Sequence, residues 1–126
     1  MALVFTTMNP VTGLSLGRIV VGIVSLVRPG VAAGMFGLDL EGNPQGQLLA
    51  RLFGSREIAL GTATLLAQGK TRRNLVLAGV SVDLADTATG VLAVQDKTVS
   101  KRTGVMLVVP AILAVLSGLA GLRRKA

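Results

Sequence analysis

The segment from Val105 to Leu122 constrains the fold most, because it contains no charged residue. Only Ser117 and Pro110 interrupt its apolar character. A helix that is apolar on every face has no side to turn toward water, and this one approaches the roughly 20 residues that span a bilayer core. The composition agrees, since 15% of the chain is charged against about 25% in soluble domains. We therefore expect an integral membrane protein.

Three further segments are apolar and about as long as a bilayer core requires. Together with the segment 105–122 they give four expected spans, at about 11–27, 48–67, 75–94 and 105–122. The pattern predicts one all-α domain over residues 1–126, an integral membrane four-helix bundle. Residues 31–40 are apolar but too short to span, and they follow the helix-ending triplet Arg28-Pro29-Gly30. They predict a short interfacial or re-entrant helix between the first two spans.

The distribution of lysine and arginine predicts the orientation. The side of the two termini holds Lys70, Arg72, Arg73, Arg123, Arg124 and Lys125, and the opposite side holds Lys97, Lys101 and Arg102, with Arg28 at its boundary. The positive-inside rule then places both termini in the cytoplasm of a multi-pass protein of the cell (inner) membrane. The net charge of +7 arises in these loops and tails. Without stacking aromatic residues it does not indicate nucleic-acid binding.

Six charged residues inside the expected spans form the candidate ligand-binding site: Arg18, Arg51, Arg56, Glu57, Asp83 and Asp86. A charge near the bilayer centre costs about 2.5–3.5 kcal/mol on insertion scales, so each needs a partner. Depths counted at about 1.5 Å per residue pair Arg18 with Asp83 and Arg56 with Asp86. Glu57 is placed to close the network by meeting Arg18 or Arg51. Any ligand is expected between the first three spans, with the fourth as a wall or an oligomer contact.

Small residues recur at the spacing of helix contacts, which in lipid lets helix backbones approach closely. The stripes comprise Gly13 with Gly17; Ser55, Ala59, Ala63 and Ala67; Ala114 with Gly118; and Ser117 with Gly121. Gly22, Gly54, Gly61, Thr87 and Gly90 are small and lie near the charges, so we expect room there.

Three sequence segments carry a resemblance to a known family. They are LGRIVVGIVSLVRPGVAAGMFGL over 16–38, ARLFGSREIALG over 50–61 and VDLADTATG over 82–90. With them the chain resembles domain-of-unknown-function family 4267 and, distantly, the DoxX-type four-helix membrane proteins. The resemblance implies four membrane helices and no established activity. The family's polar positions map to Arg18, Arg51, Gly54, Arg56, Asp83 and Asp86, and no catalytic role comes with them.

The sequence leaves three functions open. The first is a non-catalytic accessory or structural membrane component, a homo-oligomer or a subunit of a larger complex, whose charges fix helix register. The second is a binder or carrier of a small lipophilic molecule such as a lipid, quinone or terpenoid. The third, less favoured, is a cofactor-free membrane enzyme with Asp83 or Asp86 as general acid/base. Because the chain has neither Cys nor His, we expect no metal and no cofactor.

Overall fold

The computed structural model describes residues 9–123, and over that range the chain forms α-helices and no strand. The helices are α2 (Pro10–Val27), α3 (Pro29–Met35), α4 (Pro44–Leu66), α5 (Gly69–Gln95) and α6 (Lys101–Arg123). Three of them, α2, α5 and α6, are long and apolar enough to cross a membrane. The chain is therefore an all-α membrane protein, as the uncharged segment at 105–122 predicts.

The fourth long helix, α4, is not among the helices apolar enough to span a membrane. It is long enough, but Arg51, Arg56 and Glu57 lie along its middle. Of the four expected spans, three thus correspond to helices that are long and apolar enough to cross a membrane. The crossing of the bilayer by α4 stays a prediction.

Asparagine–proline pairs start two of the long helices. Pro10 opens α2 and Pro44 opens α4, each at a position where the missing N–H removes no helical hydrogen bond. The preceding residues, Asn9 and Asn43, each accept a hydrogen bond from a first-turn backbone N–H, at 2.9 and 3.0 Å. These caps satisfy donors that the helix itself leaves unpaired.

The short helix expected after the first span is α3. Its first residue is Pro29, so the Arg28-Pro29-Gly30 triplet ends α2 at Val27 and also opens α3. The helix stops at Met35, and Gly37 follows with a φ of +76°. That backbone conformation favours glycine, and it turns the chain toward α4.

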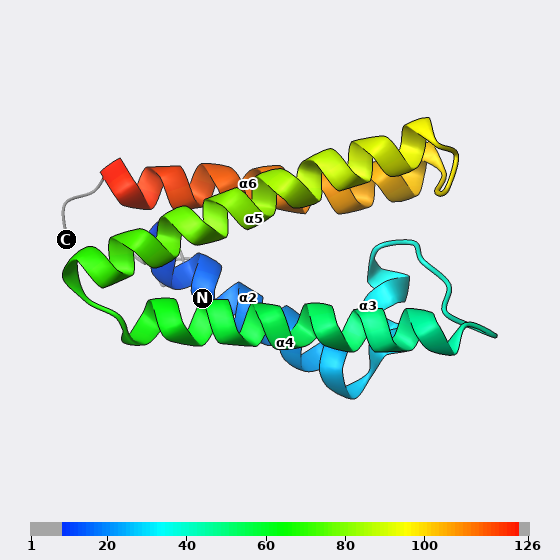
Figure 1. Ribbon diagram of the computed structural model, residues 1–126, viewed down its shortest axis with the longest axis horizontal. Helices are drawn as coiled ribbons and strands as arrows, with labels where there is room; N and C mark the ends of the chain where they lie inside the picture. Colours follow the sequence, from blue (N-terminus) through cyan, green and yellow to red (C-terminus); the bar gives the residue numbers. More distant parts are fainter. Residues whose placement is uncertain (1–8, 124–126) are drawn as a thin grey trace.

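The long helices form two pairs, α2 with α4 and α5 with α6 (Figure 1). Glycines bring α2 and α4 into backbone contact. A Cβ atom added at Gly22 would lie 2.7 Å from the carbonyl oxygen of Gly54, and one at Gly54 would lie 2.6 Å from that of Gly22. A Cβ at Gly61 would lie 2.6 Å from the carbonyl oxygen of Ser15. Because these obstacles are backbone atoms, the contact leaves no room for a side chain at any of the three positions. The expectation of free space at these three glycines is therefore wrong, since the α2–α4 contact fills it.

The expected stripes of small residues are only partly used for helix contacts. A Cβ at Gly17 would meet open space, and Ser55 and Ala59 are exposed, so these positions do not make the α2–α4 contact. In the last helix, Cβ atoms at Gly118 and Gly121 would meet valine side chains of α5 and α2. These two glycines of α6 therefore pack within the chain.

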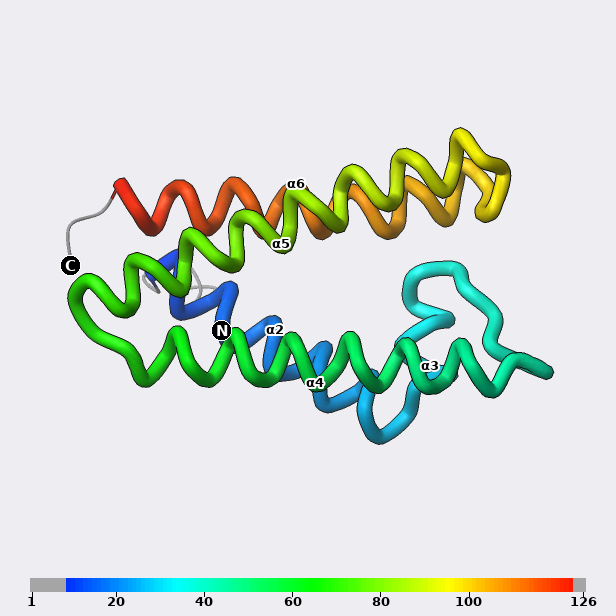
Figure 2. The backbone as a smooth tube through the Cα atoms, viewed as in Figure 1, coloured from blue at the N-terminus to red at the C-terminus, as the bar shows by residue number. Residues whose placement is uncertain are grey.

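The two pairs meet near the α4–α5 connection and diverge toward the end that carries α3 (Figure 2). A small buried apolar cluster lies where they meet, and it consists of Val11, Val76, Val80 and Val115. The largest fully buried side chains are Ser15 and Ser25, whereas large apolar side chains are exposed on every helix. A polar centre inside an apolar exterior suits a lipid surrounding, where apolar burial does not hold helices together.

Candidate ligand-binding site

Arg18 on α2 is the centre of a buried charge network. Its Nη1 donates to Oε2 of Glu57 on α4 at 3.0 Å and to Oδ1 of Asp83 on α5 at 3.1 Å. Its Nη2 also donates to the second oxygen of Asp83. The three side chains are only 7%, 8% and 4% exposed. One guanidinium group thus joins the α2–α4 pair to α5.

Arg56 and Asp86 form a second, more open ion pair. The Nη2 atom of Arg56 lies 2.8 Å from Oδ2 of Asp86 and 3.7 Å from Oε1 of Glu57. The two side chains are 37% and 36% exposed. Phe53 lies one turn earlier on α4, with its ring centre 5.1 Å from the guanidinium carbon, a cation–π contact. Within the described residues Nε of Arg56 has no hydrogen-bond partner.

The structure brings five of the six predicted site residues together. It contains both ion pairs expected from depth, and Glu57 joins Arg18, one of its two expected partners. Arg51 is exposed, and none of the ion pairs between described residues includes it. Depth along the helices predicted these pairs because rigid helices of known rise fix the level of each charge. The role of these residues in ligand binding stays a prediction.

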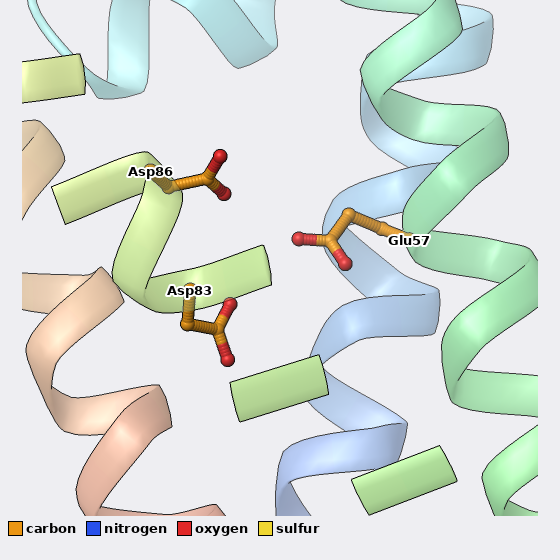
Figure 3. A group of neighbouring side chains, drawn as sticks. All are labelled: Glu57, Asp83 and Asp86. Carbon is orange, nitrogen blue, oxygen red and sulfur yellow. The ribbon is translucent and has the colours of Figure 1, made fainter. Parts of the chain in front are cut away.

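Three carboxyl groups of the network face one another, Glu57 from α4 and both Asp83 and Asp86 from α5 (Figure 3). One oxygen atom from each lies within 4.8 Å of the others. Two guanidinium groups balance two of the three charges, so the ionised network carries one negative charge in excess. The three carboxylates are close enough to share a cation, but the two adjacent arginines oppose a divalent metal ion electrostatically.

A cavity of about 690 Å³ adjoins the network between the two helix pairs. The charged residues of its wall are Arg18, Glu57, Asp83 and Asp86. Most of the remaining wall is apolar, and it comes from all five helices and the α3–α4 connection. The volume lies in the range of about 300–1,000 Å³ that is typical of small-molecule sites.

The expected site is therefore larger than the space between the first three long helices. The helix α6 contributes Leu107, Pro110 and Ala111, which agrees with its expected role as a wall. The α3–α4 connection contributes Phe36 and Leu38, which sequence reasoning did not place near the charges. Their signal in the sequence is the apolar character of residues 31–40, which by itself predicts a short interfacial or re-entrant helix.

A hydrogen bond fixes the α3–α4 connection to the start of α6. The hydroxyl group of Thr103 donates to the carbonyl oxygen of Gly37 at 3.1 Å. The backbone N–H of Thr103 donates in turn to the hydroxyl oxygen of Ser100 at 3.2 Å. A Cβ at Gly37 would lie 2.8 Å from the Thr103 hydroxyl, so glycine is needed for both the turn and the contact. This link holds the connection that forms part of the cavity wall.

Comparison with known protein families gives one result. A family model described as Domain of unknown function (DUF4267) matches residues 15–123, which include all six charges of the expected spans. No curated protein and no solved structure matches the chain. The distant likeness to DoxX-type proteins stays a prediction.

Proposed function

Since this chain belongs to the family Domain of unknown function (DUF4267), we propose its function from its own site: it binds a small lipophilic molecule. The observation that carries the proposal is the cavity of about 690 Å³ beside a buried charge network. The ligand places its polar head against Arg18, Glu57, Asp83 and Asp86. Its tail lies along the apolar wall from α3, α4 and α6. A site of this kind combines apolar contact area with a few polar groups that fix orientation.

The proposal includes a fourth membrane span, α4, with both termini of the chain in the cytoplasm. Of the three charges of α4, Glu57 is buried and Arg56 pairs with Asp86 across the helix interface. Arg51 is exposed, and its long side chain can extend toward the membrane surface. Large apolar residues occupy its exposed surface, among them Leu48, Leu49, Leu52 and Leu66. The helix thus turns two of its three ionisable groups toward the bundle and exposes several leucines. The excess of lysine and arginine on the side of the termini supports the orientation.

The proposed role is that of a non-catalytic membrane component. A general base needs a carboxylate whose lone pairs can reach a substrate proton. Both Asp83 and Asp86 accept hydrogen bonds from guanidinium groups, so each carboxylate is already engaged in an ion pair of the network. Assembly into a homo-oligomer or a larger membrane complex stays a prediction.

Filling the cavity tests the proposal. Ala50 lines the cavity on α4, whereas Ala59 lies on the exposed face of the same helix and does not line it. We expect Ala50→Trp to lose the lipophilic molecule that co-purifies with the wild-type chain in mild detergent. The matched Ala59→Trp variant should retain it. Native mass spectrometry of the three proteins gives the bound mass. Equal occupancy in all three, or none in the wild type, contradicts the proposal.

A further inference from the structure

We infer that the cavity selects a lipophilic amine, an apolar molecule whose head group is a singly charged ammonium. The inference rests on the proposed function, and it specifies the chemistry of the head group that the site recognises. Two features carry it: the excess negative charge of the network, and the identity of the charged groups that reach the cavity wall.

When all three carboxyl groups are ionised, one more cation balances the network. Three carboxylates meet two guanidinium groups in a region that α2 and α5 place inside the membrane. An uncompensated charge is costly in such a low-dielectric surrounding. A ligand with one positive charge neutralises the network, whereas a fatty acid or a phosphate adds to the excess.

The cavity wall is richer in acceptors than the network as a whole. Arg56 is not part of the wall, so the wall presents one guanidinium group and three carboxylates. That guanidinium group, of Arg18, already donates to Glu57 and Asp83. The most open acceptor is Asp86, whose side chain is 36% exposed. A head group that enters the cavity therefore meets three carboxylates, whereas the single charged donor of the wall is already engaged.

The geometry suits an ammonium group in particular. The oxygen atoms of Glu57, Asp83 and Asp86 lie within 4.8 Å of one another, so one nitrogen atom between them reaches all three at hydrogen-bond distance. An ammonium group has three N–H donors and no acceptor, which matches three carboxylates. Hydrogen bonds between charged partners are also shorter and stronger than neutral ones.

Three probes of equal chain length test the inference: decylamine, decanol and decanoate. At pH 7 the amine is protonated and the acid is ionised, as the ordinary pKa values of lysine and glutamate side chains indicate. Each probe is titrated against the full chain in phosphatidylcholine nanodiscs, and native mass spectrometry counts the bound molecules. We expect decylamine to bind at least about tenfold more tightly than either of the others. If decanol or decanoate binds as well as the amine, the head-group inference is wrong while the proposed function stands. If none binds, the proposed function itself fails.

A charge-neutralising variant sharpens the test. The change Asp86→Asn removes the excess charge, so the preference for decylamine over decanol should fall about tenfold. Asp39→Asn is the matched control, because Asp39 is exposed in the α3–α4 connection and does not line the cavity. Should Asp86→Asn not fold, Glu57→Gln makes the same change of charge. An unchanged preference in the folded variant overturns the inference.

The ammonium group has two natural sources, a free lipophilic amine or the ethanolamine head of a membrane lipid. Nanodiscs that also contain phosphatidylethanolamine separate them. Displacement of decylamine by that lipid assigns the site to a lipid head group, and undiminished binding assigns it to a free amine. Both outcomes support recognition of an ammonium group.

Discussion

Replacing Arg18 should destabilise the protein more than removing any one carboxylate of the network. Arg18 is 8% exposed and is shared by Glu57 and Asp83, so methionine at this position leaves two buried carboxylates without their main partner. Removing one partner of a buried ion pair costs about 3–5 kcal/mol of unfolding free energy. We expect Arg18→Met to fall in this range.

The change Asp83→Asn should be milder. Asparagine keeps the shape of the side chain and one acceptor oxygen, and Arg18 stays paired with Glu57. The variant also removes the excess negative charge. We expect it to lose about 1.5–3 kcal/mol, the contribution of a hydrogen bond to a charged group. The control is Arg51→Met, an exposed arginine, which should change the unfolding free energy by no more than about 0.5 kcal/mol.

The unfolding free energy can be measured by energy transfer between two dyes, because the chain contains no cysteine that would compete for labelling. Cysteines introduced at the exposed positions Ser55 on α4 and Ser81 on α5 carry a donor and an acceptor dye. Energy transfer between them reports separation of the helix pairs as the mole fraction of dodecyl sulfate rises in mixed micelles. If Asp83→Asn costs as much as Arg18→Met, the two carboxylates do not depend on one shared arginine, and the reasoning is refuted.

Three further predictions address other parts of the molecule. Asp86→Asn should cost only about 0–1 kcal/mol in the same assay, because its ion pair is about a third exposed, and a loss above about 3 kcal/mol would contradict this. Gly54→Ala should lower the unfolding free energy by about 1–3 kcal/mol, because its added Cβ meets backbone atoms of α2. Gly17→Ala faces open space and should be neutral or stabilising. Equal effects of the two changes would exclude the close contact at Gly54. If both termini are cytoplasmic, a membrane-impermeant thiol reagent should label a cysteine at Thr98 in intact cells and should not label one at Lys70. Labelling at Lys70 but not at Thr98 would contradict this topology.

The charge pairing could be predicted from sequence because few degrees of freedom remain once helices cross a bilayer. The rise per residue fixes the level of each charge, and opposite charges at one level pair to avoid isolation in lipid. This reasoning predicts the pair of Arg18 and Asp83, and the structure contains it. Arg51 carries the same charge as Arg56 but lies on an exposed face of α4, and charge alone does not reveal that difference.

The bounds of α4 and the contacts between helices were harder to predict. Apolar character begins near residue 48, yet the helix begins at Pro44, because a helix continues through polar residues when a proline and an asparagine cap define its start. Glycine spacing identified Gly17 as a contact, whereas Gly22 and Gly54 make it. Which glycine faces a partner depends on the rotation of each helix about its axis, which these spacings leave open. The cavity depends on the divergence of the two helix pairs and has no sequence signature of its own.

The division of the network between the two helix pairs has a consequence for biogenesis. Arg18 and Glu57 lie on α2 and α4, so the first pair to leave the ribosome contains its own ion pair and glycine contact. The carboxylates of α5 have no basic partner on α6, whose basic residues lie at its ends. The second helix pair therefore contributes two acidic groups, and their basic partners lie on the helix pair that is synthesised first. Both arginine partners of the two aspartates are thus synthesised before the aspartates themselves.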